Sequence, residues 1–151
     1  MTDAPFFAEH EAFRALQVLA LRLQEGAEEV LRAEGLSLAQ FNVLRILRGG
    51  DANGLTCGDI GGRLINRDPD VTRLLDRMER LGLVDRARSD RDRRVILTRL
   101  SARGRALVDR LDEPLATLHR RQFAHLSAEE LQTLLTLLRE VPNSETTANS
   151  R

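Results

Sequence analysis

The chain has 151 residues, the length of one domain or of one domain with helical extensions. Hydrophobic residues make up 42% of it, but with five Phe and no Trp or Tyr its core must be built from Leu, Val and Ile. No apolar run approaches about 18 residues and no basic segment precedes an apolar one, so neither a membrane span nor a signal peptide is expected. The single cysteine fits a reducing cytoplasm.

The net charge of zero conceals an uneven distribution. All 23 basic residues are arginine, a usage best explained by codon bias. Residues 63–105 contain 13 arginines against 7 acids, a local net charge of +6, whereas residues 1–35 contain 3 arginines against 7 acids, a net of −4. A basic segment of this kind is typical of a surface that binds nucleic acid.

The N-terminal part of the chain has the pattern of two helices. Apolar residues recur every three or four positions over residues 9–34, which predicts a long amphipathic helix that stops at Gly35. Ser37 is placed to cap a second helix, which Gly49-Gly50 ends. Residues 51–55 are expected to form a loop.

A short third helix is predicted at about residues 57–65. Thr56 and Asp59 have the spacing of a capping box at its start, with Asp in place of the usual Glu or Gln. Gly61 and Gly62 are unfavourable inside a helix, by about 1 kcal/mol each relative to Ala. Close packing against the next helix would give these glycines a physical reason.

The fourth helix is expected to have Asp68 as its N-cap and Pro69 as its first residue, and to end at Gly82. Its apolar residues are predicted to form one buried face: Val71, Leu74, Leu75, Met78 and Leu81. Its polar residues are predicted to lie opposite: Arg73, Asp76 and Arg80. A helix with a buried stripe and an arginine-bearing surface is suited to reading DNA.

Two strand-like runs follow, at residues 83–87 and 95–100, and an arginine-rich loop at residues 88–94 separates them. This loop is too polar for the core, so its arginines must face solvent or phosphate. A helix-turn-helix followed by a charged hairpin is a winged helix. The predicted fold is therefore mainly α-helical with a small β-hairpin wing, a winged helix-turn-helix flanked by N- and C-terminal helices.

Two further helices are predicted after the hairpin. Ser101 caps a helix at about residues 102–125, in which Pro114 should cause a kink or a break into two helices. The segment Ser127-Ala-Glu-Glu130 is a second capping box and begins a helix at about residues 128–140.

Several segments together resemble the MarR family of bacterial transcription regulators, over about residues 9–140. The family's wing pattern is Asp-Arg-Arg, a short apolar strand, Leu-Thr or Leu-Ser, two residues and Gly. This chain has Asp92-Arg-Arg94, Val95-Ile-Leu97 and Leu100-Ser-Ala-Arg-Gly104. The segments similar to the family's recognition helix, its exit and the opening of its second helix are Val71-Thr-Arg-Leu74, Asp76-Arg77, Gly82-Leu-Val84 and Leu36-Ser-Leu-Ala-Gln-Phe41.

The resemblance implies a homodimer in which the first, fifth and sixth helices interlock, and it divides the chain into four parts. These are an N-terminal dimerisation segment at 1–36, the winged helix-turn-helix at 37–100, C-terminal dimerisation helices at 101–141 and a disordered tail at 142–151. The partner that the resemblance implies is double-stranded DNA. Two recognition helices lie about one DNA turn apart, roughly 34 Å, so the operator is a near-palindrome. Such cytoplasmic regulators usually repress, and a small-molecule effector or an oxidant releases them.

The residues expected to contact DNA are Arg67, Asp70, Thr72, Arg73, Arg77, Arg91, Arg93 and Arg94. Arg67 and Arg73 can reach guanine edges or clamp phosphates, and Thr72 can bond a phosphate or touch a thymine methyl. Asp70 either accepts from cytosine or, the preferred reading, holds a neighbouring arginine. In the wing, Arg94 is expected to enter the minor groove while Arg91 and Arg93 contact the backbone. Asp92 is expected to orient an arginine.

Other classes of function have weaker support. Cys57, at the start of a predicted helix, leaves open a redox-responsive regulator, although a lone cysteine has no intrachain partner. His10, His119 and His125 are scattered without the spacing of metal ligands, so no metal or cofactor is expected. No enzyme motif is present, and the adjacent glutamates are read as solvated. A winged helix used only for protein contacts fits the basic segment poorly.

Overall fold

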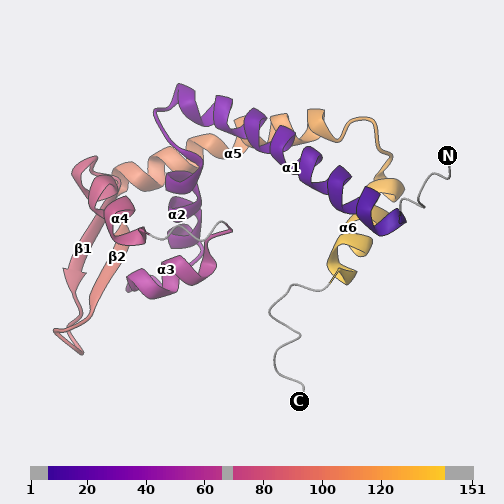
Figure 1. The fold of residues 1–151 in the computed structure, drawn as a ribbon. Helices are drawn as coiled ribbons and strands as arrows, with labels where there is room; N and C mark the ends of the chain where they lie inside the picture. The colour runs from indigo at the N-terminus through magenta and orange to yellow at the C-terminus, as the bar shows by residue number, and fades with distance from the viewer. Residues whose placement is uncertain (1–6, 66–69, 142–151) are drawn as a thin grey trace, which may run out of the picture. The chain divides into compact units, whose positions relative to one another are not determined.

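The computed structural model describes residues 7–65 and 70–141. The described chain is mostly helical with one antiparallel hairpin, which confirms the predicted fold class (Figure 1). Its elements are α1 (Ala8–Ala33), α2 (Leu38–Arg48), α3 (Cys57–Arg63), α4 (Val71–Arg80), β1 (Val84–Arg88), β2 (Ile96–Leu100), α5 (Ala102–Gln122) and α6 (Ala128–Glu140). The chain divides into two compact units, residues 1–116 and residues 117–151. Within the described ranges, no helix is both long and apolar enough to cross a bilayer.

Reciprocal capping boxes begin three of the helices, at positions where the sequence predicts a cap. The Ser37 hydroxyl accepts from the Gln40 amide at 3.1 Å, and the Ser37 amide donates to the Gln40 side chain at 3.0 Å. Thr56 and Asp59 form the same reciprocal pair at 3.1 and 3.2 Å, and hydrogen bonds from Thr56 hold the pKa of Asp59 below its ordinary value. Ser127 caps α6 in the same way. Each cap satisfies amides that a helix end otherwise leaves without partners.

The core of the first unit is aliphatic, as the composition requires. α2, α3, α4, β1 and α5 each contribute side chains that are almost fully buried. The largest are Leu31, Val43, Leu44, Ile60, Leu75, Met78, Val84, Val108 and Leu111. By contrast, α1 buries only Leu31, and none of the described residues of α6 is buried. The core therefore belongs to the winged helix and the first part of α5.

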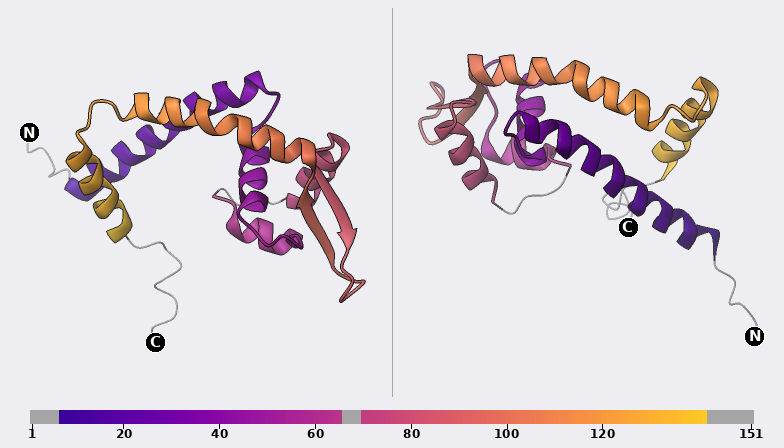
Figure 2. Two further views of the ribbon diagram at one scale, coloured as in Figure 1. Left: turned by 180° about the vertical axis from the view of Figure 1, so that it is seen from behind. Right: turned by 90° about the horizontal axis from the view of Figure 1, so that it is seen from above.

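The wing consists of β1, β2 and the loop 89–95. Its strands pair antiparallel from Val84↔Leu100 to Arg88↔Ile96, and its tip projects past α2, α3 and α4 (Figure 2, left). Leu55, expected in a loop, also pairs with β2: its amide donates to the Thr98 carbonyl at 3.0 Å and the Thr98 amide returns the bond at 2.8 Å. The base of the wing is thus fastened to the segment before α3.

The beginning of α4 differs from the sequence prediction. The helix starts at Val71 with Asp70 as its N-cap, whose carboxylate accepts from the Arg73 amide at 3.2 Å. The prediction of Asp68 as the cap was therefore wrong, and Asp68 and Pro69 lie outside the described residues. Both aspartates can cap a helix, and only the backbone conformation decides which of them does.

Smaller differences concern helix lengths, Pro114 and one of the glycines. α3 ends at Arg63, two residues early, and α5 ends at Gln122. α5 runs through Pro114 as one helix, so the alternative of two helices is wrong. A Cβ on Gly61 would lie 3.3 Å from the Val71 side chain, which confirms close packing against α4, whereas a Cβ on Gly62 would meet nothing within 4 Å.

Candidate nucleic-acid interface

The surface of α4 is polar over the opening turn and along one side. Leu75 and Met78 are buried, whereas Thr72, Arg73 and Arg77 are exposed. Leu81 is 42% exposed, so its predicted place in the buried face was wrong; it is the C-cap residue, where the helix leaves the core. Arg67, expected to read bases, lies outside the described residues.

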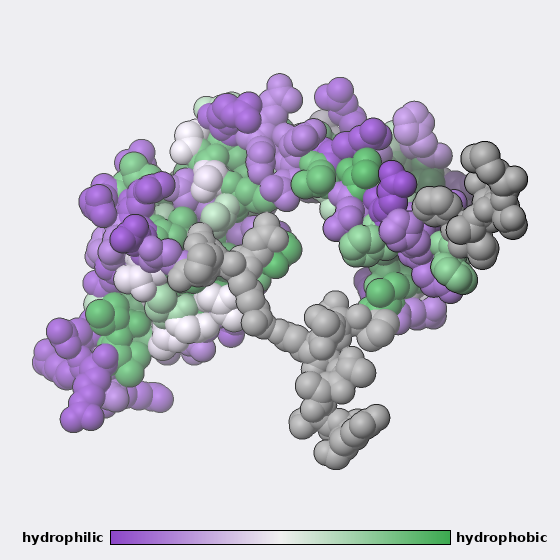
Figure 3. All heavy atoms as spheres, viewed as in Figure 1, coloured by the Kyte–Doolittle hydropathy of each residue, from purple (hydrophilic) through white to green (hydrophobic). Residues whose placement is uncertain are grey.

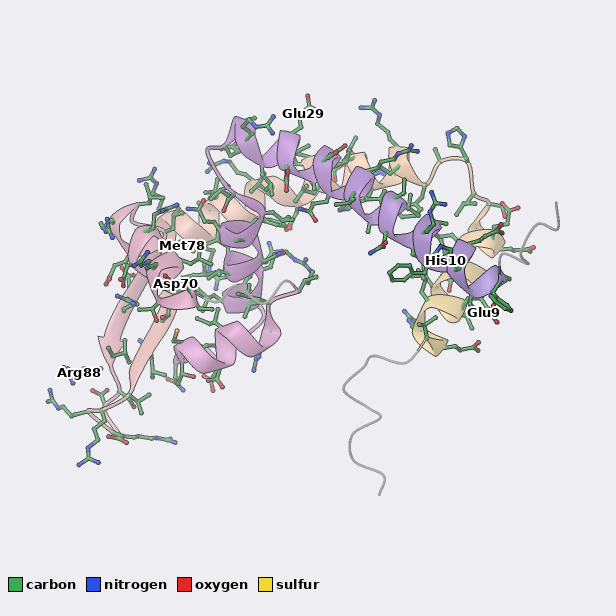
Figure 4. The ribbon with its side chains drawn as sticks, viewed as in Figure 1. Glu9, His10, Glu29, Asp70, Met78 and Arg88 are labelled. Carbon is green, nitrogen blue, oxygen red and sulfur yellow. The ribbon has the colours of Figure 1, made fainter. Side chains whose placement is uncertain are left out.

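Asp70, labelled in Figure 4, lies at the start of α4 and contacts Arg73. Besides capping the Arg73 amide, the Asp70 carboxylate lies 3.0 Å from Arg73 Nε. The Arg73 side chain is 86% exposed. The carboxylate thus restricts one side of the guanidinium and leaves the rest of it accessible, which fits an arginine that is oriented in advance of a ligand.

The sequence pattern predicts Asp76 on the exposed face of α4 with Arg73 and Arg80, but the structure does not place it there. It turns toward the wing and forms an ion pair with Arg86 of β1. Glu79 binds the same guanidinium, with Arg86 Nε donating to Oε2 at 3.1 Å. The sequence pattern does not single out Arg86. Its position two residues after buried Val84 nevertheless places both residues on one face of β1.

The tip of the wing is an exposed cluster of arginines shaped by short polar turns. Arg91, Arg93 and Arg94 are exposed, and the tip of the wing is hydrophilic in the space-filling view (Figure 3). Asp92 accepts from the Arg94 amide at 3.0 Å, so it orders the backbone of the arginine rather than its guanidinium. Arg88 donates to the Arg93 carbonyl at 2.7 Å. These contacts hold the loop open and direct its cations outward.

Other arginines of the basic segment have structural partners. Arg99 Nε donates to the Asn53 carbonyl at 2.7 Å, and Arg103 donates to the Leu81 carbonyl at 3.0 Å. Some of the thirteen guanidinium groups of the basic segment are therefore engaged within the protein. The exposed cations concentrate on α4 and on the wing tip.

Cys57 lies beside α4, with its Sγ 3.7 Å from the Thr72 hydroxyl, and is partly exposed. A modification of this thiol would therefore alter the surroundings of Thr72, which is predicted to contact DNA. In the described ranges, no group of three or more His, Cys, Asp or Glu side chains is placed to hold a metal ion.

Comparison with known proteins gives a consistent family. The family model described as MarR family matches residues 34–95. The homoprotocatechuate degradative operon repressor of Escherichia coli is 29% identical over 130 residues, covering 83% of this chain and 86% of the repressor. The transcriptional activatory protein BadR of Rhodopseudomonas palustris is 34% identical over 113 residues, or 74% of this chain and 65% of BadR.

Solved structures share the fold over nearly the whole chain. A MarR transcription factor from Planctomyces limnophilus is 35% identical with a TM-score of 0.67, covering 92% of this chain and 98% of that one. A mutant of E. coli MarR complexed with operator DNA is 26% identical with a TM-score of 0.81, covering 93% and 100%. BpsR of Bordetella bronchiseptica, described with regulation by 6-hydroxynicotinic acid, is 25% identical with a TM-score of 0.77, covering 91% and 96%.

Proposed function

This chain belongs to the MarR family of transcription regulators, which are not enzymes, and we propose that it is a homodimeric repressor that binds a near-palindromic operator and leaves it when a small molecule binds. The observation that carries the proposal is the pairing of a capped helix bearing Thr72 and Arg73 with a wing whose tip is exposed arginine. The likeness to a MarR structure solved with operator DNA supports the same reading.

In this proposal, α4 enters the major groove and the wing reaches the backbone and the minor groove. Arg73 and Thr72 contact base edges or phosphates from the first turn of α4, and Arg77 contacts a phosphate from the next turn. Arg94 enters the minor groove, with Arg91 and Arg93 on the phosphates. Arg67 is proposed for the same interface on sequence grounds alone. Asp70 acts by orienting Arg73, and Asp92 by ordering the turn before Arg94.

Dimerisation is supported by helices that have apolar faces without a core of their own. α1 is 26 residues long and buries only Leu31. Its exposed apolar residues include Phe13, Leu16, Val18, Leu19 and Leu21, and α6 adds Leu137 and Leu138. An exposed apolar surface of this extent is unusual for a monomer. A second copy of the chain, related by a two-fold axis, would cover this apolar surface. The dimer would then present two winged helices to the DNA, so that the operator has two half-sites.

The effector proposed is a small aromatic carboxylic acid. One relative is the repressor of a homoprotocatechuate degradative operon, and a similar structure is described with regulation by 6-hydroxynicotinic acid. Both of these compounds are aromatic carboxylic acids. Because operator DNA is the ligand, the cytoplasm is the compartment expected for the protein.

Binding to duplex DNA is the decisive experiment. Selection from random duplexes would identify the operator, and a fluorescence titration at several salt concentrations would measure affinity. Arg94→Ala is expected to weaken binding about tenfold or more, whereas Arg45→Ala, at an exposed arginine of α2, serves as the matched loss of one charge. Equal affinity for wild type and Arg94→Ala would refute the role of Arg94.

The same titration separates this proposal from a winged helix used for protein contacts. A DNA-binding protein loses affinity steeply as salt rises, because phosphate contacts release counterions. Absence of salt-dependent binding by the wild-type chain would favour the protein-contact alternative. Sedimentation would test the dimer against the 17.0 kDa monomer, and addition of aromatic acids to the complex would test release.

A further inference from the structure

Arg86 is the one wing residue with an ion pair to the recognition helix among the described residues. It lies in the middle of β1, opposite Thr98 of β2. Side chains alternate across a strand, so Val84, Arg86 and Arg88 share one face. Along this face burial decreases toward the tip, from buried Val84 through half-buried Arg86 to exposed Arg88. Arg86 therefore stands at the boundary between the core and the free part of the wing.

The two carboxylates that bind Arg86 come from one side of α4. Asp76 and Glu79 are three residues apart, which places them together on a helix surface. Arg86 donates through Nη2 to Asp76 and through Nε to Glu79 at 3.1 Å, and only 21% of its side chain is exposed. Partial burial acts to lower the pKa of Arg86, but the two hydrogen bonds outweigh it and the pKa lies above its ordinary value. The guanidinium therefore keeps its charge, and two of its nitrogen atoms, Nη2 and Nε, donate to carboxylates.

We propose that Arg86 is a positioning residue for DNA binding, which fixes the wing against α4 so that both meet the duplex as one rigid body. This inference rests on the proposed function. A hairpin of two five-residue strands has little stability of its own, so its direction depends on what holds its base. Leu55 holds β2 from one side, and Arg86 holds β1 from the other.

Two other roles for Arg86 make different predictions. If Arg86 bound a phosphate directly, its removal would lower the slope of log affinity against log salt by about one. If it served only to neutralise acids, the carboxylates of Asp76 and Glu79 left behind in its absence would repel the phosphates, and removing their charges would restore binding.

The test compares Arg86→Met with Arg86→Lys and with the neutral triple variant Arg86→Met/Asp76→Asn/Glu79→Gln. Positioning predicts that Arg86→Met weakens operator binding about tenfold with an unchanged salt slope. The triple variant stays weak because it also lacks the ion pairs. Arg86→Lys recovers part of the affinity, since the single ammonium group of lysine can replace only some of the hydrogen bonds that the planar guanidinium makes. Arg45→Met, at an exposed arginine of α2, is the control for one lost charge.

Wild-type affinity in Arg86→Met, a salt slope that falls by about one, or full recovery in the triple variant would each overturn the proposal. Thermal unfolding of every variant shows whether weak binding reflects loss of the fold. If Arg86→Met fails to fold, Arg86→Lys and Glu79→Gln decide in the same titrations, because each keeps one link between β1 and α4. If the wild-type chain binds no duplex, the proposed function fails before the variants are compared.

Discussion

Arg48 at the end of α2 forms a bidentate ion pair with Asp112 in the middle of α5, with both nitrogen–oxygen distances at 2.8 Å. Arg48 Nη1 also lies 3.0 Å from Asp109, one helical turn earlier. These contacts join two elements 64 residues apart in the chain. Bidentate geometry makes this pair stronger than most surface ion pairs.

Arg48→Met should lower the melting temperature by about 2–4 °C, since it removes three charge-assisted hydrogen bonds while keeping most of the apolar stem. Arg110→Met is the matched control, because Arg110 has a single longer contact of 3.3 Å to Glu34. Calorimetry of the two variants measures the difference. A control as destabilised as Arg48→Met would mean that the bidentate geometry adds nothing.

The stability of the α2–α5 link should depend on pH through Asp112. The hydrogen bond from Arg48 lowers the pKa of Asp112 from its ordinary 3.8. Its contribution is therefore complete above pH 3.8 and is lost as the pH falls through the lower pKa of the folded state. Wild type should melt at a higher temperature than Asp112→Asn at pH 7, and this difference should shrink as the pH falls below 3.8. If the difference in melting temperature between wild type and Asp112→Asn stays constant on acidification, the effect comes from packing and not from the charge of Asp112.

Gly104 should tolerate no side chain. A Cβ at this position would lie 2.0 Å from the Leu83 carbonyl oxygen, a backbone atom that cannot move away cheaply. Gly104→Ala is expected to lose about 3 kcal/mol in urea unfolding, and Gly62→Ala, which meets nothing within 4 Å in α3, to gain up to about 1 kcal/mol. Similar stability of the two variants would contradict the close approach of α5 to the residue before β1.

Asp70 is expected to act as a cap and an arginine holder rather than as a reader of bases. Asp70→Ala should destabilise the fold by about 1 kcal/mol, whereas Asp70→Ser should keep the cap and most of that stability. Both should weaken DNA binding by freeing Arg73. Selected operators should keep the same bases with Asp70→Ser; a relaxed preference at one base pair would show that the carboxylate reads cytosine.

Peroxide should leave DNA binding intact, because the single cysteine cannot form an intrachain disulfide; only a modification of the Cys57 thiol itself could act on its neighbour Thr72. The measurement is operator affinity before and after treatment, with Cys57→Ser as the control. Loss of binding that Cys57→Ser resists would instead support the redox-responsive alternative.

The sequence by itself determined the features that depend on neighbours within three or four residues. The caps at Ser37, Thr56 and Ser127 were predictable because a hydroxyl and an acidic or amide side chain three positions later satisfy the same helix end. Helical periodicity and the polar loop at residues 88–94 were enough for the order of the elements. The arginine tip of the wing followed, since so many charges cannot be buried.

The tertiary structure alone decided which distant groups meet. The sequence does not show that Asp76 turns toward Arg86, that Leu55 pairs with Thr98, or that Gly104 touches the Leu83 carbonyl. A helix position has several possible partners until the crossing of elements is fixed, and that crossing follows from packing of the aliphatic core. The sequence therefore located the arginines that can read DNA, and the fold decided which of them is free to do so and which fastens the wing.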